Sequence, residues 1–384
     1  MEKTGPSKPG EARTGHPYFT HDMILDQPSC LQSTLLTCKA EAPDIRSYYA
    51  GMNQFILTGC GTSYHAALAS SYLLYAIFQK TSAVSVESFE LTHYFRRLNT
   101  KTLVVGFSHT GNTKTTLDAM RVAKDSGAAT LGLTGTRGSK IFEIADRVLL
   151  VGNGEEKSRA HTKSYTASVL ASMHLSLDFI ANEASNKVAE GLLDQLNDVP
   201  RAVGDALKSE KEISDFVRKL NNLEDDGGKQ EIKRYFFVGA GPNIATALEA
   251  ALKIKETSYA CAEGMELEQF LHGPWVSLDS DALVVMIAPK GPAHQRYLDL
   301  LQVCRELGVK SLAITDDKHV KELASVSIEM KELSEELSPL TYIVPLQLLA
   351  YHIAIDKGLN PDLIRYDNSK IWGARQIIFP PGTH

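Results

Sequence analysis

The chain of 384 residues contains one pattern twice, and this repeat limits the folds that it can adopt. NQFILTGCGTS at 53–63 corresponds to KRYFFVGAGPN at 233–243, so that Gly59 and Gly61 lie 180 residues before Gly239 and Gly241. TLVVGFSHTG at 102–111 matches ALVVMIAPKG at 282–291 at the same offset, and TLGLT at 130–134 matches SLAIT at 311–315 one residue later. A repeat of this kind indicates a duplicated structural unit.

Within each copy, short apolar segments rich in Val, Ile, Leu and Phe alternate with helical patterns such as 64–78 and 113–126. This alternation is typical of βαβ crossovers and of a parallel sheet with helices on both faces. We therefore predict two tandem doubly wound α/β domains of the flavodoxin-like, three-layer type. We expect an N-terminal extension with a lead-in helix at 1–45, the two domains at 46–200 and 215–357, and a C-terminal tail at 358–384.

Composition excludes several classes of partner. Forty Lys and Arg against 46 Asp and Glu give a net charge of −6, and no basic run is present, so nucleic acid is not expected to bind. The N-terminus lacks an apolar signal segment and no apolar stretch is long enough to span a bilayer, so no membrane partner is expected. Five scattered cysteines, without paired spacing, favour a reducing cytoplasm and argue against a metal site or a disulfide framework.

The first copy contains a group of hydroxyl side chains where an apolar segment ends. VVGFSHTGNT at 104–113 places Ser108, His109, Thr110 and Thr113 between an expected strand and an expected helix. In parallel sheets, ligands bind beyond the carboxyl ends of the strands, where free N–H groups of the next helix face outward. These residues therefore suit a phosphate, although each hydroxyl could instead cap the helix. The second copy reads APKGPAH at 288–294, with prolines that lack N–H donors, and is not expected to bind phosphate.

GCGTS at 59–63 does not continue into a dinucleotide-binding motif, because Tyr64 stands where the third glycine would be. Close packing between the strand and the helix explains its glycines equally well. We therefore expect no nucleotide cofactor, and no other cofactor.

A helical segment in the second copy contains three charged residues at regular spacing. Glu249, Lys253 and Glu256 are spaced i, i+4, i+7 and lie along one stripe of a helix. Taken alone, the first two would form an exposed ion pair. His272 follows in FLHGPW, where Gly-Pro enforces a turn, and an imidazole is suited to proton transfer near neutral pH. A structural histidine is the alternative.

These residues, in this order, resemble the isomerase half of glucosamine-6-phosphate synthase, a tandem pair of sugar isomerase (SIS) domains. The similarity extends from MILDQPSCLQSTL at 23–35 through CGTSYHA, SHTGNT, AHTKSYT at 160–166, ALEAALKIKE and the HGP turn to VPLQLLAYHIAIDKG at 344–358. It covers nearly the whole chain.

The resemblance implies a role for each matching residue. Ser108, His109, Thr110 and Thr113, with Gly61, Thr62 and Ser63, would bind the sugar phosphate, and His109 replaces a residue that is commonly Gln. Glu256 would move the proton between C1 and C2, and His272 would open the sugar ring. Because that histidine comes from the neighbouring subunit in the family, a homodimer with shared active sites is implied. Glu249 and Lys253 match further active-site residues.

The sequence departs from the synthase at three places. The residues before the repeat contain no N-terminal nucleophilic cysteine, so we expect that glutamine is not the nitrogen donor. Lys370 lies within one residue of the position of a lysine that can form an imine with the ketose, but the following residues differ. Arg159 and His161 alter the loop before the Ser-Thr-Lys motif, which bears on the identity of the sugar.

The expected function is aldose–ketose isomerisation with deamination of an amino-sugar 6-phosphate, by proton transfer between C1 and C2 and without a metal ion. A deglycase that acts on fructosamine phosphates is an alternative that uses the same proton transfer. A non-catalytic regulator that binds sugar phosphates is a second alternative, but it would not need both Glu256 and His272.

Overall fold

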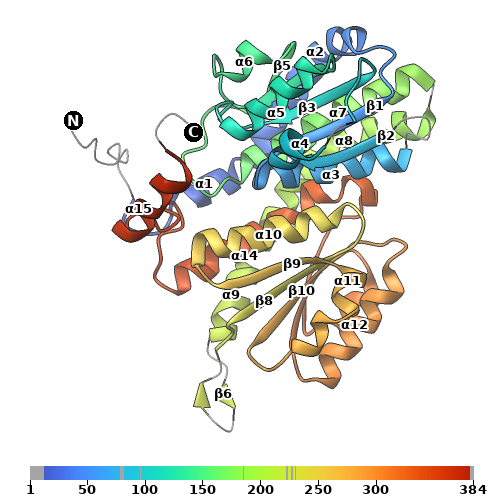
Figure 1. Ribbon diagram of the computed structural model, residues 1–384. Helices are drawn as coiled ribbons and strands as arrows, with labels where there is room; N and C mark the ends of the chain where they lie inside the picture. The colour runs from blue at the N-terminus through green and yellow to red at the C-terminus, as the bar shows by residue number, and fades with distance from the viewer. Residues whose placement is uncertain are drawn as a thin grey trace.

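The computed structural model describes residues 13–77, 82–95, 97–184, 186–221, 224–225, 228–229 and 231–380. Each copy of the repeat forms a five-stranded parallel sheet (Figure 1). The strand order is β2-β1-β3-β4-β5 in the first sheet and β9-β8-β10-β11-β12 in the second, so the two copies have the same topology. The prediction of two doubly wound, flavodoxin-like units is confirmed.

The strands are short, and those inside each sheet (β1, β3 and β4; β8, β10 and β11) are almost wholly buried, whereas the edge strands β2 and β9 are mostly half-buried or exposed. Those of the first sheet are β1 (Gln54–Gly59), β2 (Ser82–Glu87), β3 (Thr102–Phe107), β4 (Ala129–Thr134) and β5 (Arg147–Leu150). Those of the second are β8 (Arg234–Gly239), β9 (Cys261–Glu266), β10 (Ala282–Ala288), β11 (Lys310–Thr315) and β12 (Val326–Glu329).

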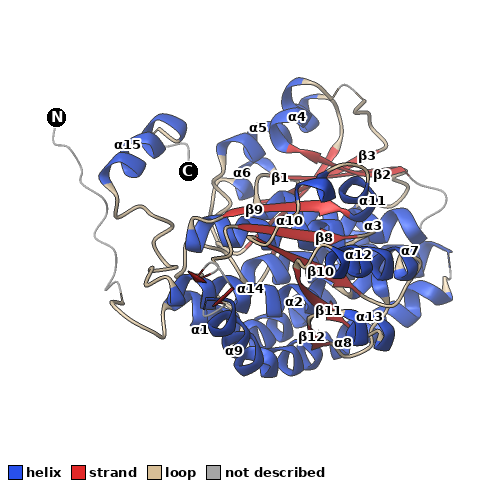
Figure 2. Ribbon diagram, turned by 90° about the horizontal axis from the view of Figure 1, so that it is seen from below, coloured by secondary structure: helices blue, strands red, loops and turns tan. Residues whose placement is uncertain are grey.

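Helices cover both faces of each sheet (Figure 2). The first unit contains α3 (Thr62–Ile77), α4 (Ser88–His93), α5 (Lys114–Asp125), α6 (Ile141–Ile144) and α7 (Lys163–Ala184), preceded by α1 (Phe19–Leu25) and α2 (Gln27–Tyr48). The second contains α10 (Asn243–Ser258), α11 (Leu267–Leu271), α12 (His294–Glu306), α13 (Lys318–Leu323) and α14 (Pro339–Asp356), with 3₁₀ turns at Pro274–Ser277 and Glu335–Leu337. A further 3₁₀ turn, Leu207–Ser209, lies in the segment that joins the units.

The inner helical layers of the two units share one hydrophobic core. Leu57 and Val105 of the first sheet and Phe237 and Val285 of the second belong to the same buried cluster. Helix α10 packs against α3 across the boundary, and α14 contacts both α10 and α7 (Figure 1). Helix α14 is buried along almost its whole length, as its apolar sequence requires.

Two helices and a short hairpin join the units. They are α8 (Lys187–Ala206), α9 (Glu210–Asn221) and the strands β6 (Glu224–Asp225) and β7 (Gly228–Lys229). After α14, the chain returns across the surface to α15 (Ser369–Ile378), which lies at the edge of the molecule in both views (Figures 1 and 2). Asp362 fixes this return because its carboxylate accepts hydrogen bonds from the backbone N–H groups of Phe19 and Thr20, at 2.9 and 2.7 Å.

The repeated Gly-x-Gly has the same physical explanation in both units. A Cβ at Gly59 would lie 2.7 Å from the Ser63 carbonyl carbon, and one at Gly239 would lie 2.2 Å from the Asn243 carbonyl oxygen. Gly61 and Gly241 both have φ of +54°, in the left-handed region that favours glycine. Both glycines therefore serve the tight turn from strand to helix.

Within the part of the chain that the structure describes, no helix is both long enough and apolar enough to cross a bilayer.

Candidate active site

A cavity of about 500 Å³ opens beyond the carboxyl ends of β1 and β3. Its walls come from the start of α3, the loop before α5, the start of α7, helix α10 of the second unit and the C-terminal tail. Most of the predicted site residues line it together: Gly61, Thr62, Ser63, His109, Thr110, Thr113, His161 and Glu256.

The loop between β3 and α5 is fixed to the end of β4. The His109 carbonyl oxygen accepts hydrogen bonds from the Thr134 hydroxyl and the Gly135 N–H group, both at 3.0 Å. Gly111 has φ of +64°, and a Cβ there would lie 1.9 Å from the Ser139 hydroxyl oxygen. The loop therefore has one conformation that only glycine permits at this position.

The hydroxyl groups of this loop are not all placed alike. Ser108 is 2% exposed and donates to Thr113 Oγ1 at 3.2 Å, so it lies behind the cavity wall. Thr113 occupies the N-cap position of α5, but its side chain makes no capping hydrogen bond. Helix capping therefore does not account for Thr113, which lines the cavity with the exposed Thr110.

The three charged residues of α10 form a buried cluster that also involves the first unit. Lys253 Nζ lies 3.2 Å from Glu249 Oε1 and also contacts the Glu256 carboxylate. Thr62 donates to Glu249 Oε1 at 3.1 Å, and His65 Nδ1 lies 2.7 Å from Glu249 Oε2. The alternative of an exposed Glu249–Lys253 ion pair is wrong, because both side chains are almost completely buried.

Burial and pairing act in opposite directions on the ionisation of this cluster. Burial favours the neutral carboxyl of Glu249, but the charge of Lys253 and the contact with His65 outweigh it and lower the pKa of Glu249. Burial also favours a neutral Lys253, but the charges of Glu249 and Glu256 outweigh it and raise the pKa of Lys253. At neutral pH Glu249 and Lys253 are therefore both charged.

Glu256 occupies the end of this cluster that faces the cavity. Its side chain is 25% exposed, whereas those of Glu249 and Lys253 are 0% and 2% exposed. A ligand in the cavity can therefore reach Glu256 but not the other two residues, and Lys253 holds the Glu256 carboxylate in place. A fixed, accessible carboxylate of this kind can abstract and return a proton.

His272 does not reach the cavity of its own chain. It follows α11, its side chain is 74% exposed, and its Nδ1 lies 2.7 Å from the Glu268 carbonyl oxygen. A role for His272 in catalysis therefore needs a second subunit.

The tail covers part of the cavity. Tyr366, Ile378, Phe379 and Pro380 line it, and the Arg159 guanidinium lies 5.3 Å from the centre of the Tyr366 ring. Arg159 is thus next to the lining residues and is not one of them. Lys370, in the first turn of α15, is exposed and also absent from the lining.

The side chains of His109 and His161 contact each other. The ring centres of His109 and His161 are 4.9 Å apart, and His161 Nδ1 lies 3.3 Å from the buried Glu156 carboxylate. Burial lowers the pKa of His109 to about 4, and the neighbouring His161 adds to this effect. His109 is therefore neutral at physiological pH.

Among the residues of the site that sequence reasoning missed are His65 and Glu156, which contact predicted site residues. His65 is three residues after Thr62 on the first turn of α3, so helical spacing could have placed both on one face. Glu156 lies in a loop, and no periodic signal relates it to His161.

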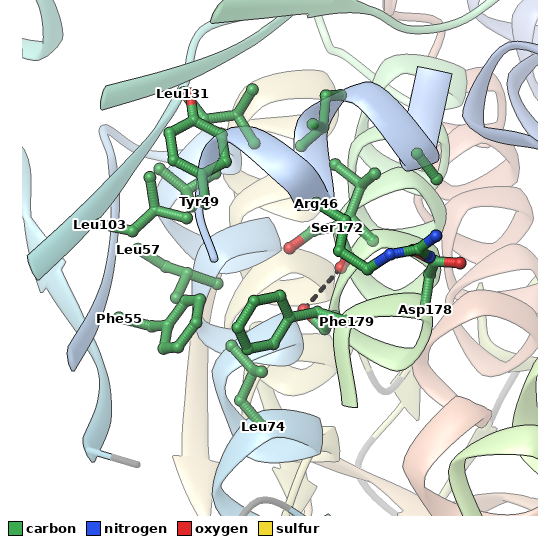
Figure 3. Close-up of a pocket in the computed structure, with 15 residues that line it drawn as sticks. Arg46, Tyr49, Phe55, Leu57, Leu74, Leu103, Leu131, Ser172, Asp178 and Phe179 are labelled. Carbon is green, nitrogen blue, oxygen red and sulfur yellow. Dashed lines mark hydrogen bonds and ion pairs between the residues drawn. The ribbon is translucent and has the colours of Figure 1, made fainter. Parts of the chain in front are cut away.

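A second cavity, of about 40 Å³, lies inside the first unit between its sheet and helices α2 and α7 (Figure 3). Phe55, Leu57, Leu103 and Phe179 form an apolar lining, and the ion pair between Arg46 and Asp178 lies at one side of it (Figure 3). It contains none of the predicted site residues and no group of catalytic side chains.

Comparisons with known proteins agree with this geometry. The model of the SIS domain matches residues 49–177 and 230–357, which are the two units described above. A relative from Pyrococcus horikoshii, glutamine–fructose-6-phosphate aminotransferase (isomerizing), is 34% identical over 91% of this chain. The chain spans 56% of the length of that relative.

Solved structures have the same fold. The C-terminal domain of glucosamine-fructose-6-phosphate aminotransferase from Francisella tularensis is 24% identical, with a TM-score of 0.81 over 91% of this chain and 99% of that one. Glucosamine-6-phosphate deaminase from Thermotoga maritima is 21% identical, with a TM-score of 0.71 over 90% of this chain and 97% of that one. With two SIS segments that cover most of its length, the chain belongs to the SIS domain family.

Proposed function

We propose that this protein is a phosphosugar isomerase that acts on an amino-sugar 6-phosphate and releases ammonia. The observation that carries the proposal is the position of Glu256. Its carboxylate is held by the buried Lys253 and lines the same cavity as the hydroxyl groups of Thr110 and Thr113. A phosphate bound at the loop would position the sugar carbons toward Glu256.

The phosphate-binding step uses hydroxyl and backbone donors. Ser63, Thr110 and Thr113 line the cavity close to the N-termini of α3 and α5. Helix N-termini carry free N–H groups and a positive dipole end, both of which favour a phosphate. Binding energy from this part of the substrate, remote from the reacting carbons, is available for positioning.

The chemical step moves one proton between adjacent carbons. With the ring open, Glu256 takes the proton from C2 and returns it to C1, while the amine gives up one N–H proton and the C1 oxygen gains one. The C1 aldehyde becomes a hydroxymethyl group and the C2 amine becomes an imine. Water then hydrolyses the imine to the ketose and ammonia, so no redox cofactor is needed. The related proteins named above include a glucosamine-6-phosphate deaminase, which supports this choice of substrate.

The proposal includes a homodimer. His272 is suited to opening the sugar ring, and its exposure leaves it available to the cavity of a second subunit. Lys370 is the candidate for imine formation with the ketose. Its amine is exposed on the tail and could reach the substrate after movement of α15. We also place the protein in the cytoplasm, because all five cysteines are free thiols.

The direct test is to incubate the protein with a panel of hexose, hexosamine and fructosamine 6-phosphates and to follow ketose and ammonia by NMR. The proposal predicts turnover of a hexosamine 6-phosphate with release of ammonia. Turnover of fructosamine phosphates alone would make the protein a deglycase. Binding without turnover of any of these compounds would make it a regulator.

A further inference from the structure

A group of three potential metal ligands lies in the wall of the cavity. One donor atom from each of His109, Glu156 and His161 can be chosen so that all three lie within 4.8 Å of one another. His109 and His161 line the cavity, whereas Glu156 is buried behind them. The group comes from two loops: His109 lies before α5, and Glu156 and His161 lie together before α7.

The distance between His161 and Glu156 suits two ligands of a tetrahedral metal ion better than a hydrogen bond. His161 Nδ1 and Glu156 Oε2 are 3.3 Å apart, and the same nitrogen is 3.3 Å from the Ser164 hydroxyl. Both distances are long for hydrogen bonds. Bonds of about 2.0–2.1 Å from zinc to nitrogen or oxygen at the tetrahedral angle separate two ligands by about 3.3–3.4 Å. His161 and Glu156 are therefore already at the spacing of two zinc ligands.

Glu156 is oriented by the backbone in a way that supports this role. Its Oε1 accepts hydrogen bonds from the Thr162 N–H, the Thr162 hydroxyl and the Lys163 N–H, at 2.5, 2.8 and 3.1 Å. Oε2 accepts only the Ser164 N–H, at 3.1 Å, besides its contact with His161. One oxygen is thus fully used in fixing the carboxylate, and the other keeps a lone pair on the side of His161. Such outer hydrogen bonds are typical of carboxylates that bind metals.

The types of ligand select the class of ion. Two imidazoles and one carboxylate form the set found in catalytic zinc sites that keep an open fourth position. Magnesium and calcium instead prefer oxygen ligands throughout. A first-row ion such as Zn²⁺ or Co²⁺ is therefore the expected class.

We propose that His109, Glu156 and His161 bind one Zn²⁺-type ion, with the fourth coordination position open to the cavity. On the proposed function, that position would accept an oxygen atom of the bound sugar phosphate. The sequence predicted a site without a metal ion. That prediction rested on the spacing of residues along the chain, which does not reveal a site built from two loops.

The test is a titration of the full chain, purified with chelator, with Co²⁺ alone and then with Zn²⁺ in competition. One tetrahedral Co²⁺ per chain, with its intense visible absorption, and its displacement by Zn²⁺ are expected. His161→Asn and His109→Gln should each weaken binding by more than the roughly 10–100-fold that loss of an outer-shell partner costs. Circular dichroism of both variants checks that the loss does not arise from unfolding.

The second group of potential ligands in the described part of the chain, His294, Asp317 and His319, provides a matched control. His319→Ala should leave Co²⁺ binding unchanged. Absence of binding to the unmodified protein, or binding that only His319→Ala weakens, would overturn the proposal. Because the titration contains no sugar, its result does not depend on the proposed function. A protein that binds the metal but has no isomerase activity would contradict the proposed function and leave the metal site intact.

Discussion

Thr62 and Glu249 are 187 positions apart in the chain, yet the Thr62 hydroxyl donates to Glu249 Oε1 at 3.1 Å. Thr62 begins α3 of the first unit, and Glu249 lies in the middle of α10 of the second. The same carboxylate also contacts His65 and Lys253. The contact joins the helix that follows the first Gly-x-Gly to the helix that carries Glu256, so the interface between the units and the candidate site depend on one buried cluster.

Lys253 should be important for stability as well as for the site. Lys253→Met leaves the buried Glu249 without its cation, and loss of one partner of a buried ion pair costs about 3–5 kcal/mol. Denaturant unfolding should show this loss, whereas Lys255→Met, which removes an exposed lysine from the same helix, should change the free energy of unfolding by less than about 0.5 kcal/mol. The double variant Glu249→Gln/Lys253→Met should recover part of the loss. Equal stability of the two single lysine variants would contradict a charged buried cluster.

Glu249 should make the protein sensitive to acid. Its pKa is lowered in the folded state, so its contribution to stability is complete above the unfolded pKa of about 4.3 and is lost as pH falls toward the lower folded value. Glu249→Gln should be less stable at neutral pH, and its free energy of unfolding should fall less steeply below about pH 5. Glu263→Gln, at an exposed position, serves as the control. Parallel pH profiles of the wild type and Glu249→Gln would show that Glu249 is not the linked group.

Thr110 should contribute to phosphate binding without contributing to folding. Its side chain is exposed and lines the cavity, so Thr110→Val removes a donor to the phosphate and leaves the core intact. A charge-assisted hydrogen bond of about 1.5–3 kcal/mol corresponds to a KM increase of roughly 10–150-fold. Thr100→Val, before β3 at the opposite end of the sheet, should leave KM unchanged. An unaltered KM in Thr110→Val would place the phosphate elsewhere in the cavity.

The sequence alone was sufficient for the architecture because the repeat and the strand-helix alternation determine topology through local signals. It also located His109, Thr110 and Thr113 in the cavity, since ligands bind where strands end in such folds. The family resemblance added the other predicted lining residues, among them Thr62, His161 and Glu256. It could not show that Glu249 and Lys253 are buried, because helical spacing gives a shared face and does not identify what covers it. Glu156 was missed because it lies in an irregular loop and contacts residues five to eight positions later, where no periodic spacing relates them.

His272 should act in the active site of the partner subunit. Glu256→Gln and His272→Ala proteins should each be inactive, and a mixture with subunit exchange should regain activity because one site of the heterodimer has both intact residues. Activity of the mixture, measured alongside exchange followed by native mass spectrometry, checks this. Demonstrated exchange without recovered activity would contradict the shared site.

The central claim is that Glu256 moves a proton between two carbons of a sugar phosphate. The most direct measurement is NMR of the bound substrate in heavy water, which detects deuterium that enters at C1 or C2. The wild type should incorporate deuterium, and Glu256→Gln should bind the substrate with similar affinity while exchange falls by about 10²-fold or more. Tight binding of sugar phosphates by the wild type without any exchange would contradict the account, and the protein would then be a sugar-phosphate sensor.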